Sequence, residues 1–501
     1  MKNIAAVFLF LLINISGIPG QSYFDYNQDV DQAYNYILQL KMDSAQHILD
    51  QLKNNTPDNL ATHHVENYID FFTVFLGEEE EEFKRFEKRK NDRLDIIKRQ
   101  EIESPFWRLS QAEITLQYAL VRSKFGEYLR AGWDVNRANK LLKKNQSIYP
   151  DFKLNYKSLS VIHSLMGSLK GIKRSLVQLF TSMDGDYAQG IQEIEDLYQA
   201  PRSDQYIFTH EISAIRALIS MHVEKKPELA YDIINRDDIK AVHSPTLEFV
   251  RYSVTKNYDQ ATDQTDVILE TALSYGGNLS FDYLQLLLGT ELLQQGDTRA
   301  AQYFMHFINN FNGRHYIKEA HQKMAWYELI MNDDESAYKA WMNRLVQDGH
   351  TAIGEDQQAQ QDALSGVIPN KDLLQARLYY DGGRYPAALN LLDNVETDEL
   401  SNDDQLEYYY RKARVLQGLY RYTEAAELYK QVIAARANDD RYFACSAALQ
   451  MGIMDAIQGR YDQAHVYFNL CQSIKPDEHQ ESLHQKAKSW QQRIKGRQSK
   501  D

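Results

Sequence analysis

The chain has 501 residues, a formal net charge of −14 and 12% aromatic residues. This length exceeds what one compact core needs, and the apolar content excludes a largely disordered chain. The acidic balance argues against general binding to nucleic acid, because like charges repel. Two cysteines in so long a chain do not make a disulfide framework.

The first residues have the pattern of a secretory signal peptide. Lys2 supplies a positive charge, residues 4–13 form an unbroken apolar run, and a small-residue, turn-prone exit ends at Gly20. The run is shorter than the roughly 20 residues that span a bilayer. We therefore predict cleavage after Gly20, export to the periplasm or the extracellular space, and no stable membrane insertion afterwards. An uncleaved anchor is the alternative.

Residues 21–345 are predicted to form degenerate helical hairpins. The first hairpin places Ala33 twelve residues before Ala45. Twelve residues lead along one helix, round a tight turn and onto the next helix, so small residues at both points allow a close crossing. No alternating run of useful length indicates a β-strand.

The same spacing recurs toward the C-terminus. It is found at Gly289/Ala301, Ala325/Ala337, Ala376/Ala388, Ala413/Ala425 and Gly452/Ala464. Because the bare spacing also occurs at Ala119/Ala131 and Ala435/Ala447, the accompanying turn and apolar residues carry the argument. Between these stretches, clusters of helix-breaking residues in 346–370 predict a hinge or long loop.

The last hairpin has the clearest pattern. After Gly452 come the turn residues 459–461, then Ala464, Phe468 and Cys471 on one helix face, and finally Pro476. This order resembles the tetratricopeptide repeat (TPR), and the broader likeness is to exported TPR proteins of Gram-negative bacteria. The resemblance implies an all-α, TPR-like helical-hairpin solenoid wound as a right-handed superhelix.

The C-terminal segment is predicted to be a basic amphipathic helix. Solenoids need a terminal helix with a polar outer face, so we interpret it as a cap, with a membrane-surface helix as the alternative. The predicted organisation is a signal peptide at 1–20, degenerate repeats at 21–345, a hinge or loop at 346–370, C-terminal TPR repeats at 371–477, and the capping helix and tail at 478–501.

A candidate binding groove follows from the resemblance, since the first helix of a TPR hairpin lines the concave surface. Arg377 and Arg414 each follow the small alanine of their repeat, and Tyr380 and Tyr410 lie one helical turn away. Two arginines flanked by rings can hold a carboxylate-bearing segment. The alternative is that both arginines pair with neighbouring acids, such as Asp381 and Glu407.

Cys445 and Cys471 lie about equally far from the turn of the last hairpin. Antiparallel helices would bring them to nearly the same level. The two alternatives are a disulfide, which export permits, and two buried thiols.

No motif for catalysis, for a cofactor or for a metal ion is present in the sequence. We therefore expect a protein that is not an enzyme and has no cofactor. The leading hypothesis is an exported scaffold that binds a protein or peptide segment through a TPR-type concave groove. The alternative is a capture protein for a glycan or another small molecule on the same repeats.

Overall fold

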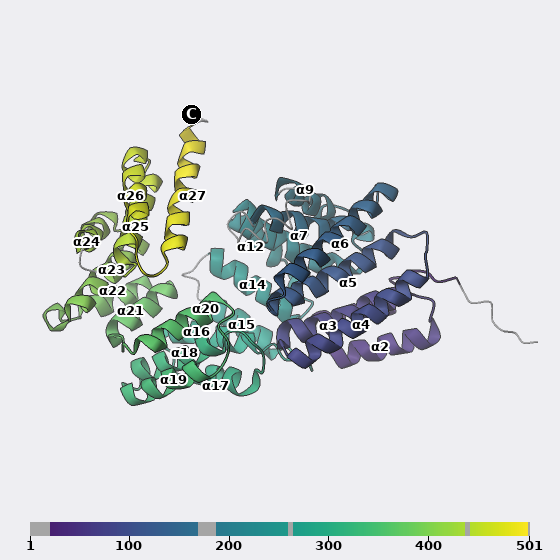
Figure 1. Cartoon of the computed structure of the whole chain (residues 1–501), viewed down its shortest axis with the longest axis horizontal. Helices are drawn as coiled ribbons and strands as arrows, with labels where there is room; N and C mark the ends of the chain where they lie inside the picture. Colours follow the sequence, from purple (N-terminus) through teal and green to yellow (C-terminus); the bar gives the residue numbers. More distant parts are fainter. Residues whose placement is uncertain (1–20, 169–186, 259–263, 436–440, 499–501) are drawn as a thin grey trace, which may run out of the picture. The chain divides into compact units, whose positions relative to one another are not determined.

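The computed structural model describes residues 21–168, 187–258, 264–435 and 441–498 (Figure 1). The predicted signal peptide, 1–20, lies outside these ranges. Within them the chain is built from helices, and the only β-type pairing is an isolated bridge between Tyr23 and Asn59. The predicted all-α, TPR-like architecture of helical hairpins is confirmed, while the handedness of the superhelix stays a prediction.

The chain forms two compact units. The first contains the described residues up to Tyr258, together with Ile268–Leu284 and Phe311–Gly313. Its principal helices are α1 (Gln28–Leu38), α2 (Met42–Asn55), α3 (Ala61–Gly77), α4 (Glu80–Arg99), α5 (Pro105–Lys124), α6 (Tyr128–Ile148), α7 (Asn155–Ser168), α9 (Tyr187–Tyr198), α11 (Thr209–Ile219), α12 (Pro227–Ile234) and α14 (Pro245–Tyr258). The short helices α10 (Arg202–Gln205) and α13 (Asp237–Lys240) complete this series.

The second unit contains the described residues of Asp259–Val267, Gln285–Asn310 and Arg314–Asp501. Two helices, α15 (Thr265–Ser274) and α16 (Tyr283–Gln295), are divided between the units. The rest of the second unit consists of α17 (Ala300–Asn310), α18 (Ile317–Met331), α19 (Glu335–Gln347), α20 (Gly354–Ser365), α21 (Lys371–Asp381), α22 (Tyr385–Asp393), α23 (Asn402–Gly418), α24 (Tyr422–Ala434), α25 (Phe443–Ile457), α26 (Tyr461–Ser473) and α27 (Gln480–Gln498).

The hairpins share one turn geometry. A residue in the left-handed backbone region follows the small residue of the first helix by seven positions, which reverses the chain within a few residues. In the last hairpin this residue is Gly459, with φ of 77°. The equivalent residues are Leu40, Gly126, Gly296, Gly383 and Tyr420, and Asp333 occupies the turn eight positions after Ala325.

The small-residue pairs lie where the hairpin helices cross. Both members are fully buried in Ala33/Ala45, Ala376/Ala388 and Ala413/Ala425, and Gly452 and Ala464 are also buried. The pairs Gly289/Ala301 and Ala325/Ala337 differ from the prediction, because Ala301 and Ala337 are only half-buried. The adjacent Ala300 and Tyr338 are the buried residues at these places. Ala119 and Ala131, which the spacing alone could not single out, are buried in the α5–α6 hairpin.

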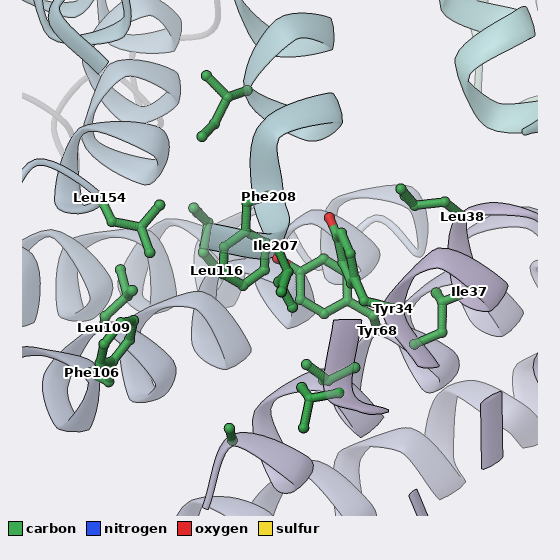
Figure 2. Packing of buried hydrophobic residues seen from close by; sticks show 14 of the residues in the cluster. Tyr34, Ile37, Leu38, Tyr68, Phe106, Leu109, Leu116, Leu154, Ile207 and Phe208 are labelled. Carbon is green, nitrogen blue, oxygen red and sulfur yellow. The ribbon is translucent and has the colours of Figure 1, made fainter. Parts of the chain in front are cut away.

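The core of the first unit is rich in aromatic rings (Figure 2). Phe208 lies against Tyr34 with ring centroids 5.2 Å apart, and Tyr34 meets Tyr68 edge-on at 5.3 Å. Such edge-to-face pairs add to the free energy of area burial. Ile207 and Phe208, just before α11, therefore connect that helix to α1 and α3.

The organisation differs from the prediction at residues 346–370. This segment contains the helix α20, whose Asp356 carboxylate accepts backbone N–H groups of Tyr316 and Glu319 at 2.8 and 3.1 Å. The division into units also falls earlier in the chain, around residues 258–314. The helix-breaking residues act as helix ends here, with Gly366 in the left-handed cap of α20.

The predicted capping segment holds α27, which packs on α25 and α26.

Candidate functional site

The predicted groove residues come from two first helices of adjacent hairpins in the second unit, α21 and α23. Arg414 Nη2 donates a hydrogen bond to Tyr380 Oη at 2.6 Å, and the guanidinium lies 4.9 Å from the ring centroid. The structure thus brings these two predicted residues together across adjacent repeats. The phenol oxygen accepts a hydrogen bond from the charged guanidinium, and among the described residues the half-buried Arg414 has no acidic partner.

Arg377 is the more accessible of the two arginines. Its side chain is 38% exposed, and Nε lies 3.7 Å from the carboxylate of Asp381. The guanidinium also lies 5.2 Å from the ring centroid of Trp326 on α18. An exposed ion pair at this distance is weak, so Arg377 can exchange Asp381 for another carboxylate at little cost.

Tyr410 does not line a groove. Its side chain is 4% exposed, its hydroxyl is 2.8 Å from Ser446 Oγ, and its ring packs 4.9 Å from that of Phe443. The prediction placed Tyr410 beside Arg414 because the two are one helical turn apart. That spacing is correct, but α25 covers this side of α23 and turns the ring into the core.

The predicted pairing of the groove arginines with neighbouring acids is present only in part. Asp381 lies beside Arg377, whereas Glu407 binds Arg411, whose Nε and Nη2 donate to Glu407 Oε1 at 2.9 and 2.8 Å. Arg414 therefore does not pair with Glu407, and its partner in the described structure is Tyr380.

The two cysteines are fully buried on facing helices, α25 and α26. They are free thiols in this structure, with the sulfur atoms of Cys445 and Cys471 3.6 Å apart. A disulfide would require the sulfur atoms to approach to about 2.05 Å. The disulfide itself stays a prediction.

We expect protein isolated from an oxidising compartment to carry the Cys445–Cys471 disulfide. Because the sulfur atoms already face each other, bridging needs only a small side-chain movement. Titration of the denatured, unreduced protein should then find no free thiol, and the reduced protein should show both. A Cys445→Ser variant should show one thiol in either state. Two thiols in the unreduced sample would establish the alternative.

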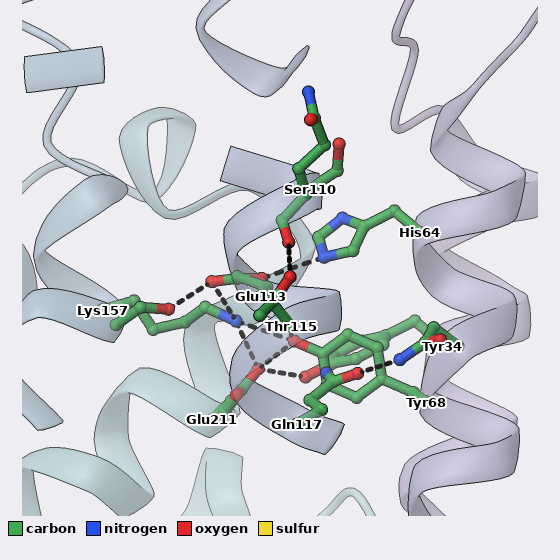
Figure 3. A network of polar contacts seen from close by, with 12 residues as sticks. Tyr34, His64, Tyr68, Ser110, Glu113, Thr115, Gln117, Lys157 and Glu211 are labelled. Carbon is green, nitrogen blue, oxygen red and sulfur yellow. Dashed lines mark hydrogen bonds and ion pairs between the residues drawn. The ribbon is translucent and has the colours of Figure 1, made fainter. Parts of the chain in front are cut away.

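Sequence reasoning missed a buried polar cluster in the first unit (Figure 3). At its centre is Lys157 of α7, whose Nζ lies 3.1 Å from Glu113 Oε1, 2.8 Å from Glu211 Oε2 and 2.8 Å from Tyr68 Oη. Tyr34 Oη also donates to Glu211 at 2.7 Å. This cluster joins α1, α3, α5, α7 and α11.

Glu113 is the most enclosed acid of this cluster. Burial alone would raise its pKa, but Lys157 and His64 outweigh that effect and hold the pKa at about 2. His64 Nε2 lies 3.0 Å from Glu113 Oε2, and Ser158 Oγ donates to Oε1 at 2.8 Å. The Glu113 carboxylate is 3% exposed, whereas Glu211 is 28% exposed, so the enclosed part of the cluster connects helices and is not a ligand site. An available signal was a glutamate between the apolar residues 112 and 114.

The described residues contain no group of three or more His, Cys, Asp or Glu side chains arranged to hold a metal ion. Over the same residues, none of the helices combines the length and the apolar character that crossing a membrane requires. Buried acids of the first unit instead pair with neighbouring side chains, as Glu113 does with His64 and Glu193 does with His163.

Comparison with known proteins finds no matching family model and no significantly similar curated protein. Three solved structures are similar over most of this chain. The apo form of the quorum sensor NprR from B. thuringiensis is 12% identical, with 81% of this chain and 97% of that chain covered and a TM-score of 0.25. A monomeric mutant of IFIT1 with Gppp-AAAA is 11% identical, with 86% and 99% covered and a TM-score of 0.28. Yeast Tom70 is 12% identical, with 94% and 95% covered and a TM-score of 0.26. At these values the likeness carries no argument about function.

Proposed function

We propose that this protein is an exported, non-enzymatic scaffold that binds a protein or peptide segment through a groove centred on Arg377 in the second unit. The observation that supports this best is the pair of stacked first helices, α21 and α23, which carry Arg377 and Arg414 in adjacent repeats. Arg377 is 38% exposed and held only by a long ion pair, so a carboxylate of a partner can replace Asp381. Export is supported by the signal-like pattern at 1–20.

The chemistry of this groove favours a carboxylate-bearing segment. Trp326 lies beneath the Arg377 guanidinium, and a cation over a ring keeps its hydrogen-bond donors directed outward. Arg414 and Tyr380 supply a second donor pair in the next repeat. Because Tyr410 belongs to the core, the proposed contact set is Arg377, Tyr380 and Arg414.

We expect an Arg377→Ala, Arg414→Ala variant to lose its partner. A partner is first identified by crosslinking in envelope extract and mass spectrometry, and its affinity is then measured with purified proteins. Losing two charge-assisted contacts should weaken the affinity by about tenfold or more. Because Arg414 also bonds to Tyr380, the melting temperature must be recorded, and the single Arg377→Ala variant separates binding from stability.

The matched control is Arg421→Ala. Arg421, at the N-terminal end of α24, is 46% exposed and pairs with the nearby Glu424, as Arg377 pairs with the nearby Asp381. Its removal should leave the affinity unchanged. If the Arg377→Ala variant binds as tightly as the parent protein while both remain folded, the groove assignment is wrong.

A further inference from the structure

A surface pocket lies on the first unit, and none of its lining residues belongs to the proposed groove. Its volume is about 370 Å³. Gln111 of α5 forms one wall, and the remaining lining comes from α6, with Trp133, Asn136, Arg137, Lys140, Leu141 and Lys144. The pocket therefore depends almost entirely on one face of a single long helix.

Three cations follow this face of α6. Arg137, Lys140 and Lys144 are spaced by three and four residues, which places them on one stripe, and all three are exposed. Within the described residues, none of the three has an ion pair or a side-chain hydrogen bond. Arg130, on the same helix, does pair with an acid, Glu127, at 3.3 Å. The stripe is thus a local excess of positive charge in a chain whose net charge is −14.

Helix α4 places one more cation near the stripe. The pKa of Lys98 is lowered, first by partial burial and then by Arg137, against the opposite effect of Asp95. The one acid of α6, Asp134, pairs with Arg122 Nη1 at 2.9 Å, and Arg137 is a further cation that acts on this carboxyl. One carboxylate that also pairs with Arg122 leaves the three cations of the stripe in excess.

An exposed indole stands at the N-terminal end of the stripe. Trp133 is 60% exposed, and within the described part of the chain it makes no ring contact and no hydrogen bond. Leu141 adds apolar surface to the lining, and the alkyl stems of the basic residues extend it. A tryptophan left in water beside a pocket is an available apolar contact for a ligand.

The hydrogen-bonding groups of the pocket discriminate between ligand classes. Lysine and arginine only donate, and the Gln111 amide already donates to Trp107 O at 2.7 Å. A neutral sugar can accept hydrogen bonds from these cations, but it brings no negative charge to match them. The side chains of an Asp- and Glu-rich segment bring charged acceptors, and an aromatic or aliphatic side chain within it can cover Trp133.

We propose that this α6 pocket is a second binding site, for an acidic peptide segment that carries an apolar side chain. Trp133 to Lys144 spans about 16 Å along the helix, which an extended segment of about five residues matches. The carboxylates pair with Arg137, Lys140 and Lys144, and the apolar side chain lies on Trp133. The site does not depend on the proposed groove.

The test uses the full-length protein and a fluorescein-labelled peptide of alternating Glu and Phe. Anisotropy should show saturable binding that weakens as salt is added. Arg137→Glu with Lys140→Glu should weaken binding by about tenfold or more, because attraction becomes repulsion at two positions. Trp133→Ala should weaken it severalfold, and a peptide with Gln in place of Glu should not bind.

Controls separate a local site from a general charge effect. Lys486→Glu with Lys488→Glu changes the net charge equally at two exposed positions of α27, and its binding should equal that of the parent protein. The groove variant Arg377→Ala should also bind this peptide normally, so failure of one proposal leaves the other intact.

Three outcomes would overturn the inference. The first is unchanged peptide binding by the α6 double variant. The second is an equal loss in the α27 double variant. The third is preferential, α6-dependent binding of a sulfated glycan or a single-stranded oligonucleotide over the peptide.

Discussion

Replacing Lys157 with methionine should destabilise the first unit by about 3–5 kcal/mol, because the change leaves the buried Glu113 carboxylate without its lysine. Lys157 is 2% exposed and contacts both Glu113 and Glu211. Glu113 is itself enclosed, so water cannot replace the lost ammonium group. Urea unfolding should show the loss, and hydrogen exchange should locate it in α5, α7 and α11.

A second substitution distinguishes the loss of the ion pair from a packing defect in the Lys157→Met variant. Adding Glu113→Gln to the Lys157→Met variant removes the most buried carboxylate that has lost its lysine, and we expect it to restore at least half of the lost stability. Lys88→Met, at an exposed position of α4, is the matched control and should change stability by less than about 0.5 kcal/mol. A loss below about 1 kcal/mol for Lys157→Met would show that the cluster is not a stabilising connection between helices.

Phe468→Ala should destabilise the C-terminal hairpins by about 3–5 kcal/mol. The ring is fully buried on α26 and fills the space that Gly452 leaves on α25. A side chain at Gly452 would place its Cβ 2.6 Å from Phe468 Cε1, so the ring and the glycine fit each other closely. Removing the ring leaves a cavity that neither helix can close without moving.

The matched control for this variant is Val466→Ala. Val466 lies on the same helix but is 57% exposed, so its truncation should change stability by less than about 0.5 kcal/mol. Unfolding is best monitored by hydrogen exchange in α25 and α26, because two compact units need not unfold in one step. Equal effects of the two truncations would show that the predicted repeat contact does not stabilise the hairpin.

The hairpins could be predicted from the sequence because their contacts are local. Gly452, Gly459 and Phe468 lie within one hairpin, so the turn and the helix crossing follow from the spacing along the chain. The spacing of small residues is a weaker signal by itself, because alanines twelve residues apart also occur by chance. Ala119 and Ala131 are buried in a real helix crossing, but their spacing did not distinguish them from such chance pairs.

The orientation of a side chain in a stack of hairpins depends on the next hairpin, which spacing does not encode. Arg377, Tyr380 and Arg414 were predicted from their places in the repeat, and the contact of Arg414 with Tyr380 agrees with adjacent first helices. Tyr410 was assigned to the groove by the same rule but is covered by α25.

The sequence by itself therefore determined the all-α class, the hairpin repeats and the turns, since these depend on residues close together in the chain. Only the tertiary structure decided which polar residues are enclosed and which cations remain unpaired. Lys157 meets carboxylates 44 and 54 residues away, and the α6 stripe is defined by three exposed cations that form no ion pair within the described residues. Electrostatic pairing acts through space, so it appears only once the helices have packed.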